Sequence, residues 1–191
     1  MNSVFSCTCG ATEWHVTAPR TGTRLMCYCA DCQTFARHLG ADILGPAGGS
    51  DLLQISPAQV SFVRGAENLA LLKLSPKGLS RWHTSCCNTP VCNTLKSAKL
   101  PFVSLFCASH QGEDRELGRV VAHANTVFGH GPHKPAKDRG LGRLVISFSK
   151  RILGDRMSGQ WKATPFFAPP DWSPVAAPHV ITKEERNRAR P

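Results

Sequence analysis

Cysteines are the residues of this chain best suited to chemistry, because seven of the nine stand in three short groups. The groups are Cys7-Thr8-Cys9-Gly10, Cys27-Tyr28-Cys29-Ala30-Asp31-Cys32 and the vicinal pair Cys86-Cys87. Thiolates two and three residues apart can converge on one ion, and zinc prefers four such ligands at tetrahedral angles. The spacing therefore predicts a zinc protein with one or two zinc ions per chain.

Disulfide bonds are the alternative use of so many cysteines, and they require an oxidising compartment. The first six residues have no basic segment followed by an apolar one, so no export signal is recognised and we expect a cytoplasmic protein with reduced thiols. The isolated Cys92 and Cys107 are expected to be small, buried apolar side chains rather than ligands.

Size and charge limit the remaining possibilities. The 191 residues are enough for one substantial core, and no apolar run approaches the roughly 20 residues of a membrane span. The net charge of +10 lies mainly in residues 134–191, which hold 12 Lys or Arg and 5 Asp or Glu. Such a surface suits nucleic acid, anionic lipid or an acidic substrate, or has no specific partner. With one Tyr and no basic segment interleaved with aromatic residues, we expect no specific nucleic-acid binding. The sequence does not indicate an oligomeric state.

The pattern of elements changes near residue 125, so we expect a zinc-binding domain over 1–125 and an appended segment over 126–191. Short strands separated by turn signals are predicted at residues 12–17, 60–64, 69–74, 79–83 and 102–107. A brief helix is predicted over 30–38. An amphipathic helix begins near residue 141, with an apolar stripe that should dock on the body; a membrane-surface helix is the alternative. A Pro-rich extended arm and a frayed charged tail are expected to follow.

The cysteine motifs resemble those of the glutathione-dependent formaldehyde-activating enzyme and centromere protein V family. That family has Cys-x-Cys-Gly, then Cys-x-Cys-x-x-Cys, then Arg-x-Phe-Cys-x-x-Cys-Gly-Thr-Pro. The first two motifs are intact here, at residues 7–10 and 27–32. The third, at residues 81–90, keeps Arg81, Cys87, Thr89 and Pro90 but has Thr84 in place of a cysteine. The chain thus resembles a divergent member over residues 5–107.

The resemblance implies a mainly β, Mss4-like antiparallel fold with two zinc sites. A structural site would use Cys7, Cys9 and Cys87, and a second site would use Cys27, Cys29 and Cys32. The fourth structural ligand is open: Cys86 could serve if the backbone turns there, the site could be weakened or empty, and His83 is a further alternative.

The second site, with three thiolates and one exchangeable position, is the expected catalytic centre. Zinc there can hold a substrate thiol, which suits addition of glutathione to an aldehyde or the reverse carbon–sulfur cleavage. Arg37, Arg64 or Lys73 could bind the carboxylates of glutathione. The sequence therefore predicts a zinc-dependent carbon–sulfur lyase, similar to S-hydroxymethylglutathione synthase and acting on glutathione or another thiol–aldehyde adduct. The alternative is a non-catalytic, zinc-stabilised binding module.

Overall fold

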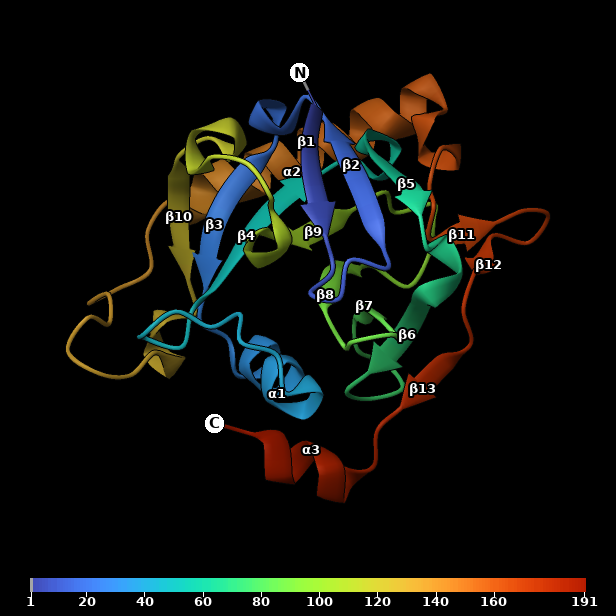
Figure 1. Cartoon of the computed structure of the whole chain (residues 1–191). Helices are drawn as coiled ribbons and strands as arrows, with labels where there is room; N and C mark the ends of the chain where they lie inside the picture. Colours follow the sequence, from blue (N-terminus) through green and yellow to red (C-terminus); the bar gives the residue numbers. More distant parts are fainter. Residues whose placement is uncertain (1) are drawn as a thin grey trace.

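A computed structural model describes residues 2–191, and this part of the chain is mainly β with three α-helices (Figure 1). Its largest element is an eight-stranded sheet with the order β10-β3-β4-β9-β8-β7-β6-β13. Its strands are β3 (Thr23–Cys27), β4 (Ser50–Ile55), β6 (Leu69–Lys73), β7 (Ser80–Thr84), β8 (Pro90–Thr94), β9 (Val103–Phe106), β10 (Val120–Ala124) and β13 (Pro178–Val180). Neighbouring strands are antiparallel except at the two edges, where β10 pairs with β3 and β13 with β6 in parallel.

A smaller three-stranded antiparallel sheet covers one face of the large sheet. It has the order β1-β2-β5, formed by β1 (Asn2–Ser6), β2 (Glu13–Thr17) and β5 (Val60–Arg64). Alternation along these strands aims Phe5 and Trp14 inward, where they share a core with Trp82 and Leu105 of the large sheet. The first and third cysteine groups lie in turns of these two sheets, so this core fixes the distance between them.

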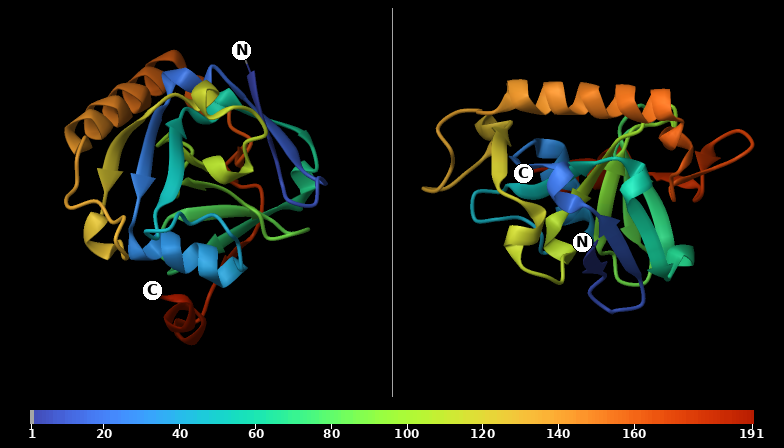
Figure 2. Two further views of the ribbon diagram at one scale, coloured as in Figure 1. Left: turned by 60° about the vertical axis from the view of Figure 1, so that its left-hand side comes forward. Right: turned by 90° about the horizontal axis from the view of Figure 1, so that it is seen from above.

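The opposite face of the large sheet carries the helices (Figure 2). Helix α1 (Ala30–Leu39) packs Phe35 against Phe106, with ring centroids 5.8 Å apart, and α2 (Leu141–Ser158) places Leu144 in the same cluster. Helix α3 (Lys183–Ala189) lies against α1. No helix within residues 2–191 is long and apolar enough to cross a bilayer. The two faces of the large sheet are thus covered differently: the small sheet covers one, and the face that carries the helices holds the pocket described below.

The C-terminal segment is built into the fold. Phe166 is fully buried beside Trp82, with ring centroids 5.3 Å apart, and Phe167 follows in the short β11 (Phe167–Ala168), paired with β12 (Ser173–Pro174). The Pro-rich stretch then reaches β13 at the sheet edge. Residues from both sides of position 125 therefore contribute to one core.

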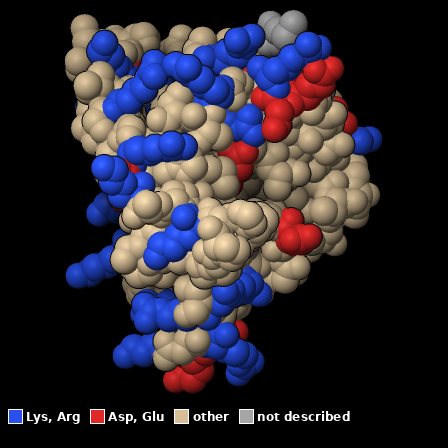
Figure 3. Space-filling view, turned by 90° about the vertical axis from the view of Figure 1, so that its left-hand side faces the viewer, with Lys and Arg blue, Asp and Glu red and all other residues tan. Residues whose placement is uncertain are grey.

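One expectation about this segment is wrong, and another is met only in part. The charged tail is not frayed: α3 is helical because Thr182 caps it and Glu185 completes a capping box. The apolar stripe of α2 is only partly docked, since Leu144 is buried and Phe148 contacts Phe102 whereas Val145 is 63% exposed. Lys and Arg side chains are spread over much of the molecular face shown in Figure 3.

Candidate metal centres

Four cysteines meet where a turn of the small sheet faces a turn of the large one. Cys7 and Cys9 follow β1, and Cys86 and Cys87 lie in the turn between β7 and β8. Their sulfur atoms all lie within 4.8 Å of one another. The Sγ–Sγ distances are 3.5 Å for Cys7–Cys9, 3.4 Å for Cys9–Cys86, 3.9 Å for Cys7–Cys86 and 3.8 Å for Cys86–Cys87. We call this group the tetrad.

The backbone turns explain why both pairs converge. A residue with positive φ directly follows each pair, Gly10 at 73° and Asn88 at 57°, and Asn is one of the few side chains that tolerate this conformation. The turn at residues 85–87 bends the chain, so the vicinal cysteines do not point to opposite faces as they would in a strand. The structure therefore brings Cys86, and not His83, together with the other three cysteines.

Threonines support the tetrad instead of joining it. The side chains of Thr84 and Thr89 lie 3.4 Å and 3.1 Å from the Cys87 sulfur. Burial alone would raise the pKa of Cys87, but hydrogen bonds from Thr8, Thr84 and Thr89 lower it to about 4. His83 lies elsewhere, with its ring edge toward Phe35 and its centroid 6.4 Å away.

The second group, which we call the triad, is positioned by a strand end and a helix start. Cys27 is the last residue of β3, Cys29 is the N-cap of α1, and Cys32 lies in its first turn. The Cys29 sulfur accepts a hydrogen bond from the Cys32 backbone N–H at 3.4 Å. The positive end of the α1 dipole favours negative charge at this point, which suits thiolates.

The three triad thiols interact closely. Hydrogen bonds from Cys29 and Cys32 lower the pKa of Cys27 to about 3 against the opposing effect of its burial. Conversely, the interaction with the Cys27 thiolate raises the pKa values of Cys29 and Cys32. Within residues 2–191, no fourth Cys, His, Asp or Glu joins the triad. Negative charge is thus favoured at one of the three sulfurs, that of Cys27, and the three converging sulfurs leave space for one more ligand.

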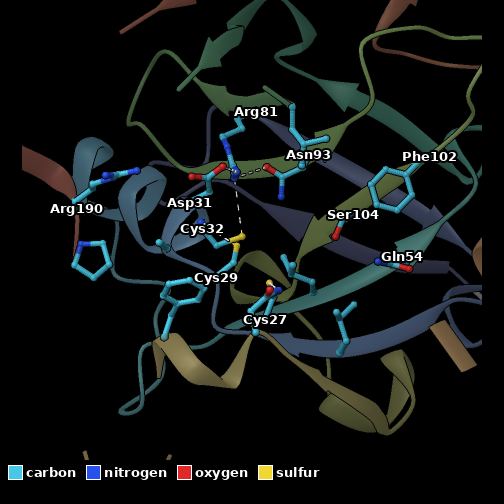
Figure 4. Close-up of a pocket in the computed structure, with 17 residues that line it drawn as sticks. Cys27, Cys29, Asp31, Cys32, Gln54, Arg81, Asn93, Phe102, Ser104 and Arg190 are labelled. Carbon is cyan, nitrogen blue, oxygen red and sulfur yellow. Dashed lines mark hydrogen bonds and ion pairs between the residues drawn. The ribbon is translucent and has the colours of Figure 1, made fainter. Parts of the chain in front are cut away.

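Arg81 of β7 places a buried positive charge beside the triad. Its side chain is 3% exposed, and its Nη1 lies 4.0 Å from the Cys32 sulfur and donates to the Asn93 Oδ1 at 3.1 Å. Its Nη2 lies 3.7 Å from the Asp31 carboxylate, and its guanidinium carbon is 5.5 Å from the centre of the Phe35 ring. Arg81 therefore compensates negative charge on the sulfurs (Figure 4).

The triad opens into a pocket of about 780 Å³ on the helical face of the large sheet. Apolar walls come from Leu25, Leu52, Leu79, Phe102 and Phe128, whereas Asp31, Gln54, Arg81, Asn93, Ser104, Asn125 and Arg190 supply polar groups. Asn125 donates to the Cys27 sulfur at 3.7 Å. A cavity of this size accommodates a small organic molecule next to the three sulfurs.

Several residues considered from the sequence lie away from this pocket. Arg37 donates to the Arg190 carbonyl, Arg64 pairs with Glu13, and neither they nor Lys73 line the pocket, so the expectation that these cations bind glutathione carboxylates there is wrong. Cys92 and Cys107 are buried outside both groups, as expected. The sequence analysis did not identify the uncharged polar residues that line the pocket, because no sequence motif marks them; they are Gln54, Asn93, Ser104 and Asn125.

Comparisons with known proteins give one family assignment. A crystal structure of a Rhodobacter sphaeroides protein is similar with a TM-score of 0.41 and 22% identity, covering 63% of this chain and 98% of that chain. A search of curated proteins finds no match. The model of a family of unknown function, DUF6151, matches residues 2–154, and the chain belongs to this family.

Proposed function

We propose that the chain binds one zinc ion at the tetrad and one at the triad, and that the triad zinc accepts a small-molecule thiol. The observation that carries the proposal is the combination of three converging sulfurs, no fourth protein ligand within residues 2–191, and a 780 Å³ pocket at the remaining side. A closed four-ligand site is typical of structural zinc, whereas an open position is typical of reactive zinc.

The geometry of the tetrad fits this metal. Zinc–sulfur bonds of about 2.3 Å at tetrahedral angles place the sulfurs about 3.8 Å apart. The Sγ–Sγ distances of 3.4 to 3.9 Å lie close to this value. The thiolate-only donor set also favours zinc over the harder cations magnesium and calcium.

The proposed reaction is addition of a thiol to an aldehyde, or its reverse, as in a carbon–sulfur lyase. A carbon–sulfur bond forms between the thiol and the carbonyl carbon, and the thiol proton passes to the carbonyl oxygen; cleavage reverses both changes. Zinc at the triad would supply a bound thiolate at neutral pH. Arg81 would offset the net negative charge of three thiolates and zinc, and the apolar walls would limit water at the reacting carbon.

The resemblance of the motifs to the formaldehyde-activating family supports the same proposal. It suggests glutathione as the thiol, an Mss4-like fold and activity similar to S-hydroxymethylglutathione synthase. The intact second motif forms the triad, and Cys86 supplies the fourth tetrad sulfur that the altered third motif lacks at Thr84. The departure in that motif therefore does not remove the proposed structural site.

One observation favours the alternative, a zinc-stabilised binding module without catalysis. No histidine is among the residues that line the pocket, so the commonest general acid or base of enzymes is missing from the lining. In this alternative the triad still binds a thiol, but no adduct is made or broken.

Metal analysis with zinc-edge X-ray absorption, recorded with and without glutathione, tests the proposal. We expect two zinc ions per chain and a rise in the mean sulfur count from about 3.5 to about 4 when glutathione binds. Cys29→Ser is the matched control, because it should retain one zinc and show no response. A wild-type spectrum that ignores thiols would contradict the proposal.

Activity separates the two functions. NMR can follow S-hydroxymethylglutathione formation from glutathione and formaldehyde, with the Cys29→Ser variant measuring the uncatalysed rate. Acceleration by the wild type supports the lyase. Thiol binding without acceleration, for this and for other thiols paired with formaldehyde, supports the binding module.

A further inference from the structure

Four polar side chains form a row across the floor of the pocket, one from each of four neighbouring strands. Gln54 of β4 is in register with Ser104 of β9, Ser104 with Asn93 of β8, and Asn93 with Arg81 of β7. Since residues in register on adjacent strands point to the same face, all four lie on the side that holds the triad. They appear in this order in Figure 4. We call them the polar row.

Three members of the polar row have unused hydrogen-bonding capacity. The Ser104 hydroxyl and the Gln54 Oε1 are buried without a hydrogen-bond partner. Asn93 is 2% exposed and accepts from Arg81 through Oδ1, and none of the hydrogen bonds within residues 2–191 uses its side-chain N–H groups. Buried polar groups usually have partners, and each unpaired group costs free energy. Their alignment in one pocket indicates a ligand that supplies the partners.

The row also has a direction relative to the sulfurs. Arg81 contacts Cys32 and Asn93, so Asn93 is the nearest of the three to the triad, followed by Ser104 and Gln54. Strands lie about 4.8 Å apart, which gives the row a length of about 14 Å from Arg81 to Gln54. A thiol held at the triad would therefore extend its remaining atoms along Asn93 and Ser104.

The charges select a neutral group for this position. Asn93, Ser104 and Gln54 carry no charge, and Arg81 already serves Asn93, Asp31 and Cys32. Arg190, the other cation that lines the pocket, is exposed. A carboxylate on the row would lose its hydration without gaining a free cationic partner, which is costly. An amide, in contrast, offers both the donor and the acceptor that the row can pair.

We propose that the polar row binds a neutral carboxamide of the substrate, so that the preferred thiols are uncharged and amide-bearing rather than carboxylate-bearing. This inference rests on the proposed thiol position at the triad and narrows the choice of thiol: glutathione, which carries carboxylates, would bind more weakly than an uncharged, amide-bearing thiol. Two thiols, N-acetylcysteine amide and N-acetylcysteine, differ only in a terminal carboxamide or carboxylate and form a matched pair. Ethanethiol, which has no polar tail, reports on the triad alone.

The test uses cobalt(II)-substituted protein, in which thiol binding changes the sulfur-to-metal absorption. We expect N-acetylcysteine amide to bind about tenfold more tightly than N-acetylcysteine. Ser104→Ala and Gln54→Leu should each weaken binding of the amide roughly 3- to 10-fold, the usual range for one lost hydrogen bond, and leave ethanethiol binding unchanged. Ser80→Ala is the control, because Ser80 is also buried and unpaired but precedes Arg81 and points to the other face of the sheet.

The outcomes distinguish a failure of the proposed thiol position from a failure of the polar row alone. If ethanethiol and both N-acetyl thiols leave the spectrum unchanged, the open metal position is wrong and this inference fails with it. If ethanethiol binds but the matched pair binds equally, or the Ser104 and Gln54 variants behave like Ser80→Ala, the polar row does not bind the substrate while the proposed thiol site remains.

Discussion

Replacing one cysteine in each group should separate a structural from a reactive site. The tetrad joins cysteine pairs that are 77 to 80 residues apart, whereas the triad spans the six residues from 27 to 32, a separation of five. If a metal cross-link restricts the unfolded chain as a disulfide does, closing a loop of 77 residues stabilises the fold by about 4.5 kcal/mol, and closing one of five by about 2 kcal/mol. Loss of the tetrad metal should therefore cost about 2.5 kcal/mol more than loss of the triad metal.

The variants are Cys9→Ser and Cys29→Ser, compared with the wild type by urea denaturation in the presence of zinc. Both exchanges are small, and serine at position 29 is itself a good helix N-cap, so α1 keeps its start. If the total stability lies near the lower end of the typical range of about 5–15 kcal/mol, the Cys9→Ser protein should be close to unfolding, whereas Cys29→Ser should remain folded.

The control is the same series with a chelator present. All three proteins should then have the same free energy of unfolding to within about 0.5 kcal/mol, because the cross-links are absent from each. The reasoning is refuted if Cys29→Ser is as destabilising as Cys9→Ser, or if the deficit of Cys9→Ser persists in the chelator.

Three other predictions address the core, the buried arginine and the basic surface. Phe166→Ala should lower the free energy of unfolding by about 3–5 kcal/mol in urea denaturation, because the ring is fully buried against Trp82. Val180→Ala, at 40% exposure, should change it by less than about 1 kcal/mol. An effect of Phe166→Ala as small as that of Val180→Ala would show that Phe166 is not part of the core. Arg81→Gln should weaken zinc binding at the triad but not at the tetrad in chelator competition, since it removes the charge next to Cys32; an equal loss at both sites would contradict this role. Fluorescence anisotropy with duplex DNA should show only weak binding that falls steeply with salt, and a tight complex at physiological salt would overturn the expectation of no specific nucleic-acid partner.

The triad could be predicted from the sequence because its cysteines are local, only two or three residues apart, so turn geometry alone brings them together. The meeting of Cys7 and Cys9 with the distant Cys86 and Cys87 was expected only from the family resemblance. The choice between Cys86 and His83 could not be made in this way, since it depends on how the chain turns after β7. Asn88 was the available signal, because Asn is one of the few residues that tolerate the left-handed conformation found at this position.

The sheet was predicted only in part, for physical reasons. Strands β2, β5, β6, β7 and β9 were predicted to within one residue of their observed bounds, whereas β1, β4, β8 and β10 were not predicted. Strand β3 was missed because four of its five residues are buried, so it has no clear alternation. The parallel edge pairs join segments distant in sequence. The polar row could not be predicted for the same reason: Gln54 and Ser104 are 50 residues apart in the sequence, and only the strand register aligns them.

Arg81 connects the metal centre with the floor of the pocket. A buried guanidinium is tolerated only when negative charge and hydrogen-bond acceptors surround it. Asp31 supplies a carboxylate at 3.7 Å whose side chain is 62% exposed, so part of the compensation must come from the sulfurs. With the proposed zinc bound, three thiolates and one zinc ion would carry a net charge of −1, which Arg81 would neutralise. The Nη1 of Arg81, which contacts the Cys32 sulfur, also donates to the Oδ1 of Asn93 and so leaves the N–H groups of Asn93 available to a ligand. The proposed metal loading and the proposed preference for a neutral substrate group would therefore both follow from the same buried charge.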